Sequence, residues 1–353
     1  MGCDAVILDH HTLGDTDTER AVYANPLLYG MDGTRSGCAS SLALLFAVTL
    51  NQRNWDLAPV AFAGIVGDKQ HLGGLTGLNV YLYEEASKRG YVSKHPGSYV
   101  PLGDLSSELF ANPDPYIIGI TDDPDGTEAL LRDIGAPPGA RGETLDEATT
   151  SKLSAVIASR LISQGVSSHK MSEALRERFS FKDIPMDAER FSAVIDVCGR
   201  NDQASVALAA AMGDSGCLRQ ADELYMGSRR GLLDAVRNAR ENLVSMENIQ
   251  WFDATDTGFT GRTTEIVMSY IGDPSKVTIG FNGQDERAKL SSRATFPLLD
   301  RGVNMAVAMD RACTQMGGFG GGHPIAAGGT IPVDKKEEFF ALLDSIVGSQ
   351  KSS

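Results

Sequence analysis

A short apolar strand that runs into an acidic residue and two histidines is the feature that most constrains the fold. The apolar stretch 5–8 is followed directly by Asp9, His10 and His11. Because open α/β sheets bind their ligands at the carboxyl ends of strands, these side chains are predicted to belong to a binding site. A carboxylate beside imidazoles suits Mn²⁺, Zn²⁺ or Fe²⁺ better than Ca²⁺. A polar loop without a metal is the alternative, and the three residues alone do not distinguish the two.

A second apolar stretch places another acidic residue where it can join the first three. Residues 60–68, "VAFAGIVGD", are predicted to form a second buried strand that ends at Asp68. Helices are predicted at 38–50 and 75–89, with Gly90 placed to stop the second. The first 90 residues are therefore predicted to be α/β, and the ends of both strands would converge on one ion.

The rest of the chain divides into a connecting region and a second α/β region. Clusters of Pro, Gly and Asp characterise 91–185, which contains one clear helix at 151–164 and is interpreted as an insertion or connector. The elements predicted after it are a long helix at 220–246, strands at 249–254, 264–271 and 276–281, and helices at 304–316 and 335–347. We therefore predict a domain at 1–90, an insertion at 91–185, connecting helices at 186–245 and a second domain at 246–349.

Two short stretches of the second α/β region are candidates for binding an anion. In "GGGHP", Gly321 and Gly322 let the backbone approach a ligand closely, and His323 adds a further donor. A flexible turn is the alternative, but the small-residue strand material that follows favours a packed site. In "KLSSRAT", Arg293 ends a strand among hydroxyls and can bind phosphate with two parallel hydrogen bonds. A lone Arg is more often a surface residue, so this second signal is weak in isolation.

Composition limits the classes of function. The formal net charge of −14 argues against a protein that coats nucleic acid through Lys and Arg, but it leaves room for an enzyme with a local basic groove. The five cysteines are scattered without a CxxC pair, which favours a reducing cytoplasm over a disulfide framework. No apolar run approaches the roughly 20 residues that span a bilayer, and no secretory leader is recognised. We therefore expect a cytoplasmic protein without a membrane partner.

The order of these motifs resembles one known group of enzymes. "DHH" after a strand, "GIVGD" and a distal "GGGHPIAAG" together resemble the DHH phosphoesterase superfamily, and the distal part resembles its DHHA1 substrate-binding domain. "YGMDGTRSGCASS" and "KLSSRATFPLLDRG" are similar to the archaeal RecJ-like single-strand nucleases. The resemblance covers most of the chain except about 91–185. It implies an α/β fold class, with a partial parallel-sheet DHH domain and a smaller α/β DHHA1 domain.

The resemblance also implies roles for the candidate residues. Members of the superfamily hold two Mn²⁺ or Mg²⁺ ions, and the motif matches imply that His10 and Asp68 bind the second ion. Asp9 would orient the site, and His11 would face the phosphate. The remaining candidates would hold a nucleic-acid end or a nucleotide, and these are Arg293, Gly321, Gly322 and His323.

The same resemblance implies that part of the site is missing. Two further metal-binding motifs should precede Asp9, and the sequence begins eight residues before it. We therefore expect an N-terminally truncated, RecJ-like phosphoesterase or exonuclease for single-stranded DNA or RNA, with at most a partial metal site and impaired activity in isolation. The alternatives are an oligonucleotide or nucleotide phosphoesterase of the same superfamily, or a non-catalytic nucleic-acid-binding partner in a replication or repair assembly.

Overall fold

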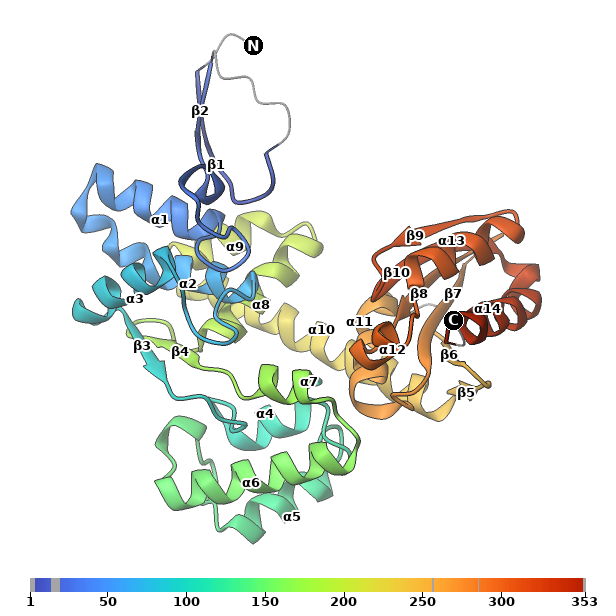
Figure 1. The fold of residues 1–353 in the computed structure, drawn as a ribbon. Coiled ribbons are helices and arrows are strands. Elements are labelled where there is room, and N and C mark those ends of the chain that lie inside the picture. Colours follow the sequence, from blue (N-terminus) through green and yellow to red (C-terminus); the bar gives the residue numbers. More distant parts are fainter. Residues whose placement is uncertain (1–3, 14–19, 256, 285, 352–353) are drawn as a thin grey trace. The chain divides into compact units, whose positions relative to one another are not determined.

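The computed structural model describes residues 4–13, 20–255, 257–284 and 286–351 (Figure 1). The chain forms two compact units. Unit 1 comprises Met1–Asp104, Arg141–Thr144 and Ser172–Met226, and unit 2 comprises Leu105–Ala140, Leu145–Met171 and Gly227–Ser353. The α/β fold class is confirmed. The domain boundaries at 90, 185 and 245 stay a prediction.

Unit 1 is built mainly from helices around an aromatic core. Trp55, Phe62, Phe179 and Phe191 are its largest fully buried side chains. Its elements are β1 (Ala5–Leu8), β2 (Ala21–Ala24), η1 (Pro26–Tyr29), α1 (Ala39–Leu50), η2 (Gln52–Leu57), α2 (Ala58–Gly67), α3 (Leu78–Lys88), β3 (Val92–His95), η3 (Gly142–Thr144), β4 (Arg178–Phe181), α8 (Ala188–Arg200), α9 (Ala204–Ala211) and the first turns of α10 (Ser215–Glu241). The predicted helices 38–50 and 75–89 correspond to α1 and α3.

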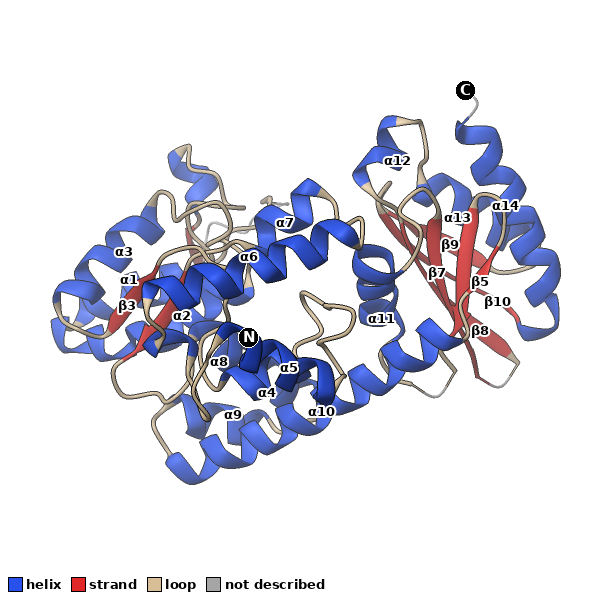
Figure 2. Cartoon of the chain, turned by 90° about the horizontal axis from the view of Figure 1, so that it is seen from below, coloured by secondary structure: helices blue, strands red, loops and turns tan. Residues whose placement is uncertain are grey.

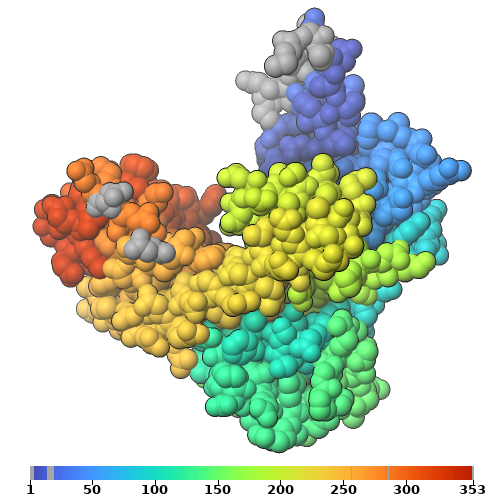
Figure 3. All heavy atoms as spheres, turned by 180° about the vertical axis from the view of Figure 1, so that it is seen from behind, coloured from blue at the N-terminus to red at the C-terminus, as the bar shows by residue number. Residues whose placement is uncertain are grey.

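The first strand is present as predicted, but it is not buried. It pairs in parallel with β2, with Val6 opposite Val22, and the two strands form a sheet of their own. Val6 is 54% exposed and Val22 is 67% exposed, because both faces of this narrow ribbon are largely open to solvent. Figure 3 shows the ribbon projecting from the helices of unit 1. The prediction of a buried strand is therefore wrong in its burial.

The predicted strand 60–68 is wrong, because this segment forms helix α2. Pro59 stands in the first turn of the helix, where a missing N–H costs nothing, and Asp68 caps its end. Phe62 and Ile65 are fully buried, so the helix is apolar on most of its surface. A continuous apolar run of this length does not reveal its period, and a buried helix and a buried strand then look alike in sequence.

Unit 2 contains a six-stranded sheet with helices on both faces. The strand order is β5-β6-β7-β8-β10-β9, and β6 pairs in parallel with β7 while the other pairs are antiparallel. Its elements are α4 (Leu105–Ala111), α5 (Pro124–Ile134), α6 (Glu147–Ser163), the first turn of α7 (Ser168–Ala174), the later turns of α10, β5 (Val244–Ser245), β6 (Ile249–Asp253), α11 (Thr260–Ile266), η4 (Val267–Ile271), β7 (Val277–Gln284), β8 (Arg287–Arg293), α12 (Phe296–Asp300), α13 (Met305–Gln315), β9 (Phe319–Gly322), β10 (Ala326–Pro332), η5 (Val333–Lys335) and α14 (Lys336–Lys351).

Most predicted elements of this unit are confirmed, but one strand is not. The predicted strands 249–254 and 276–281 correspond to β6 and β7, and the helices 151–164, 304–316 and 335–347 to α6, α13 and α14. The long helix predicted at 220–246 runs from Ser215 to Glu241. The predicted strand 264–271 is wrong, because α11 and the helical turn η4 occupy it.

Packing explains why this segment is helical. Its β-branched residues favour a strand by propensity, but Thr264 lies against the glycine Gly280 of β7, whose missing side chain leaves room for a helix to approach the sheet. Figure 2 shows α11 on one side of the sheet and α13 and α14 on the other. Among the described residues, every helix is too short or too polar to cross a membrane.

The buried side chain of His71 makes the stability of unit 1 depend on pH. Both ring nitrogens are buried without a hydrogen-bond partner among the described residues, and burial lowers the pKa of His71 to about 4. Glu189 lies 3.9 Å from Nε2, but its carboxylate is already paired with Arg176. Below pH 6.5 the unfolded chain binds a proton at this imidazole, and the folded chain does not until about pH 4.

We therefore expect the free energy of unfolding to fall by about 3 kcal/mol between pH 6.5 and pH 4 because of this residue. His71→Phe keeps the ring that packs edge-on against Phe179 and removes the titrating group. Denaturant unfolding across this pH range should therefore show a flatter curve for the variant. Parallel curves for the two proteins would show that His71 does not cause the loss.

Candidate metal centre and phosphate-binding site

The Asp9-His10-His11 turn is held between the two strands of the N-terminal ribbon. The backbone N–H of Asp9 donates to the carbonyl of Ala24 at 3.2 Å, at the end of the β1–β2 ladder. The buried Asn25 donates from Nδ2 to the carbonyl of His11 at 3.0 Å and caps η1 through its Oδ1. Both ends of the turn are therefore fixed by hydrogen bonds.

His10 is oriented by a backbone carbonyl. Its Nδ1 lies 2.8 Å from the carbonyl oxygen of Gly33. Because a carbonyl only accepts, Nδ1 carries the proton and Nε2 is left as the nitrogen that can bind a metal. The approach is close, since a Cβ at Gly33 would lie 2.3 Å from the carbonyl oxygen of His10. Position 33 is therefore restricted to glycine.

A buried chain of amides holds Gly33 in place. Gln70 donates from Nε2 to the Gly33 carbonyl at 2.8 Å and accepts from Asn79 Nδ2 at 2.8 Å. Asn79 in turn accepts from the Ser41 hydroxyl. Gln70, Asn79 and Ser41 are each no more than 1% exposed, so the carbonyl that orients His10 is supported by a desolvated polar network.

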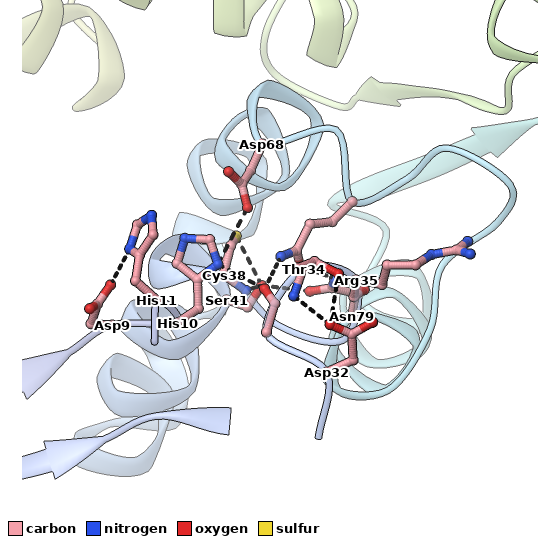
Figure 4. A network of polar contacts seen from close by, with 12 residues as sticks. Asp9, His10, His11, Asp32, Thr34, Arg35, Cys38, Ser41, Asp68 and Asn79 are labelled. Carbon is pink, nitrogen blue, oxygen red and sulfur yellow. Dashed lines mark hydrogen bonds and ion pairs between the residues drawn. The ribbon is translucent and has the colours of Figure 1, made fainter. Parts of the chain in front are cut away.

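Asp68 reaches His10 from the end of α2. Its Oδ2 lies 3.7 Å from His10 Nδ1, although the element that carries it is a helix and not the predicted strand. Figure 4 shows Asp68 pointing from α2 toward His10, while Asp9 and His11 pair on the other side. The structure thus brings together all four residues that the sequence singles out in this region.

Asp9 and His11 form a hydrogen-bonded pair. His11 Nδ1 lies 2.8 Å from Asp9 Oδ1, and this hydrogen bond lowers the pKa of Asp9. The ligand atoms of Asp9, His10 and His11 all lie within 4.8 Å of one another, and one carboxylate with two imidazoles suits a divalent transition metal. These three donors are therefore spaced to fit one ion, and Asp68 lies beside His10 but is not part of this group.

In unit 2, strand pairing brings the second set of candidates to one end of the sheet. Arg293 ends β8 and lies opposite Ala326 of β10. Ala326 exchanges two backbone hydrogen bonds with His323, which follows the end of β9. Arg293 and the exposed His323 are therefore on either side of the first residue of β10, close to the glycines of β9.

Arg293 is half-buried and partly satisfied. Its Nη1 donates to the Ser291 hydroxyl at 3.1 Å and to the Ser292 carbonyl at 2.9 Å. Burial lowers the pKa of this guanidinium, and the negative charge of Glu265 opposes the effect. Nη1 is engaged, whereas Nε and Nη2 make no hydrogen bond to any described residue, and Nη2 lies near Gly261 of α11.

Gly321 and Gly322, at the end of β9, differ in what surrounds them. Gly322 has a φ of 142°, and a Cβ there would lie 2.7 Å from the carbonyl oxygen of Ala326. A Cβ at Gly321 would meet nothing within 4 Å, so that position borders open space. The tight turn explains Gly322, whereas Gly321 leaves an accessible stretch of backbone.

The sequence does not reveal the residues that support the metal donors. Gln70 and Asn79 contact partners 9 to 44 positions away, and a buried amide looks like a surface one in sequence. The only local signal is the position of Gln70, two residues after Asp68.

Part of the chain matches a known domain family, and nearly all of it matches one known sequence. The DHHA1 domain model matches residues 249–349. An uncharacterised protein of Methanocaldococcus jannaschii is 29% identical over 352 residues, and the match covers 98% of this chain and 76% of that protein.

Two solved structures share the fold over nearly the whole chain. CDC45 from Entamoeba histolytica superposes with a TM-score of 0.59 at 12% identity, covering 98% of this chain and 80% of that one. The exonuclease RecJ bound to manganese superposes with a TM-score of 0.52 at 15% identity, covering 98% and 69% of the two chains. At these identities the likeness establishes a common fold.

Proposed function

We propose that the chain is a metal-dependent phosphodiesterase of the DHH/DHHA1 superfamily that acts on single-stranded DNA or RNA, because residues 249–349 match the DHHA1 domain model and the chain shares its fold with RecJ. The observation that carries the proposal is the orientation of His10. Its Nδ1 is engaged by the Gly33 carbonyl, its Nε2 makes no hydrogen bond to any described residue, and the Asp68 carboxylate lies 3.7 Å from Nδ1. This is the preparation that a metal-binding imidazole requires.

His10 and Asp68 are the residues that would hold a divalent ion, Mn²⁺ or Mg²⁺. When bound, such an ion activates water and stabilises negative charge on a phosphoryl group. The chain itself contributes the fixed direction of the imidazole, through Gly33 and the amide network behind it.

Asp9 and His11 are proposed to act on the substrate. The carboxylate of Asp9 holds the proton on His11 Nδ1, so Nε2 of this exposed ring is the atom free to face a phosphate and exchange a proton with it. Hydrolysis forms a bond from the water oxygen to phosphorus and breaks the ester bond, and the departing oxygen takes up a proton. His11 is the described side chain best placed to move that proton.

Arg293, Gly321, Gly322 and His323 are proposed to bind the phosphate end of the substrate. Substitution Arg293→Lys keeps the charge but loses the fork that contacts Ser291, Ser292 and a ligand together. We expect about ten-fold weaker binding of a 5′-phosphorylated oligonucleotide, measured by fluorescence anisotropy at fixed low salt. Arg311→Lys, at an exposed position of α13, is the matched control. Equal affinities with equal thermal melts would remove Arg293 from the site.

A non-catalytic role is the second candidate, and one observation favours it. The family resemblance implies two ions, whereas within the described ranges a single group of three metal donors gathers. A nucleic-acid-binding partner in a replication or repair assembly would not need the second ion. We further propose a cytoplasmic location, because the four described cysteines are free thiols.

The experiment compares substrates and metals with the full chain. A labelled single-stranded oligonucleotide and a dinucleotide are each incubated with Mn²⁺, Mg²⁺ or EDTA. Turnover of the oligonucleotide that EDTA abolishes is the expected result. Turnover of the dinucleotide alone would favour a small-nucleotide phosphoesterase, and binding without turnover in any metal would favour the non-catalytic partner.

A further inference from the structure

The register of the six-stranded sheet aligns four side chains in one row across the sheet. Asn282 of β7 lies opposite Lys289 of β8, Lys289 lies opposite Thr330 of β10, and Thr330 lies opposite Phe319 of β9. The strand neighbours of Lys289, Ala288 and Leu290, are buried on the opposite face against α13 and α14. Because side chains alternate along a strand, the row faces away from that core.

This face of the sheet is open at its edge strand, β9. The ring of Phe319 is 68% exposed, and a Cβ at Gly321, two residues further on, would meet nothing within 4 Å. Helix α11 packs on this face over β7 and β8, toward the middle of the sheet. Lys289 is exposed, and no acidic side chain pairs with it among the residues that the structure describes.

The same face leads from this row to Arg293. One row further along lie four small residues, which are Gly280, Ser291, Gly328 and Gly321. The row after that contains Arg293 beside Ala326. Four residues along a strand span about 13 Å, so Lys289 and Arg293 are separated by the row of small residues. The same row ends next to the exposed ring of Phe319.

We propose that this face is a second nucleic-acid subsite, in which Phe319 stacks on a base and Lys289 pairs with a phosphate of the strand whose end is held at Arg293. The inference rests on the proposed function and specifies its substrate as a single strand longer than one nucleotide. An isolated exposed apolar residue needs no explanation. Here, however, an exposed ring shares a face with Arg287, Lys289 and Arg293, in a chain whose net charge is −14.

Charge complementarity selects the occupant. A polyanion is attracted to the three cations of β8, and base stacking on an aromatic ring tolerates any sequence. Gly321 and Gly328 have no side chains, so a sugar–phosphate backbone can lie close to the sheet beside Phe319. A subsite of this kind adds affinity for an oligonucleotide and adds none for a mononucleotide that reaches only Arg293.

The test measures binding in EDTA, so that it does not depend on hydrolysis. Fluorescence anisotropy with a labelled oligothymidylate compares wild type with Phe319→Leu and Phe319→Trp. Leucine keeps the apolar volume without the ring, and we expect about ten-fold weaker binding, whereas tryptophan should stay within about two-fold of wild type. Competition by a mononucleotide should be the same in all three proteins.

Lys289 is tested through the salt dependence. Lys289→Gln should reduce the slope of log affinity against log salt by about 0.7, and Lys289→Arg should leave it unchanged. If wild type binds the oligonucleotide and all four variants bind it equally with the same slope, the subsite is wrong while the proposed function stands. If wild type neither binds nor cleaves any oligonucleotide, the proposed function itself fails, and the subsite with it.

Discussion

Replacing His10 with alanine is expected to remove divalent-metal binding at the Asp9–His11 turn and to lower hydrolysis by at least about a hundred-fold. The Nδ1 of this imidazole is fixed at 2.8 Å from the Gly33 carbonyl, which leaves Nε2 as the nitrogen that can bind a metal. Losing it removes a metal ligand, and a metal supplies several kcal/mol of transition-state stabilisation. Calorimetric titration with Mn²⁺ and a single-strand digestion assay measure the two effects.

A histidine outside the site provides the control for this variant. His95 lies in β3 and pairs with the Ser180 hydroxyl at 2.8 Å, within the same unit. His95→Ala should change metal affinity and turnover less than two-fold. Full Mn²⁺ affinity and full turnover in His10→Ala would show that the ion, if it binds, uses other donors.

Substitution Gly33→Ala is expected to weaken metal affinity and turnover by about 10- to 100-fold while the chain stays folded. A Cβ at this position would lie 2.3 Å from the carbonyl oxygen of His10, so the two loops must move apart. That movement breaks the hydrogen bond that orients the imidazole. Loss of a residue that hydrogen-bonds to a metal ligand typically lowers metal affinity or activity by about 10- to 100-fold. Metal titration and a thermal melt of the same preparation separate a site defect from a folding defect.

Gly37 offers a matched control in the same loop. A Cβ there would meet Leu78 and Pro26 at 3.5–3.6 Å, which is ordinary contact. Gly37→Ala should therefore retain metal affinity. If both alanine variants bind Mn²⁺ as wild type does, the contact between Gly33 and His10 does not control the site.

The candidate metal donors singled out in the sequence lie close together, although the prediction for the element that carries one of them is wrong. Asp68 lies beside His10 as expected, although α2 replaces the predicted strand. The prediction survives because the end of an apolar segment emerges at the boundary of the core in either conformation, and that boundary is where a polar residue can meet a ligand. The strand β2, at Ala21–Ala24, is not predicted from the sequence, and it is recognised here through its pairing with β1.

The hydrogen bonds that orient His10, and the strand pairing that brings Arg293 and His323 to one end of the sheet, both depend on tertiary contacts. Gln70 donates a hydrogen bond to Gly33, 37 positions away, and no local sequence pattern at either residue predicts this contact. Arg293 and His323 are singled out separately in the sequence, but only the pairing of β8 with β10 and of β10 with β9 places them at one end of the sheet. The row from Asn282 to Phe319 likewise exists only through strand register, which no single segment encodes.

The most direct test of the metal centre is a crystal structure of the full chain soaked with Mn²⁺, with anomalous data collected at the manganese edge. We expect an anomalous peak within coordination distance, about 2 Å, of His10 Nε2, with Nδ1 still bonded to the Gly33 carbonyl. A map with no peak near His10, at Mn²⁺ concentrations that support turnover, would contradict it.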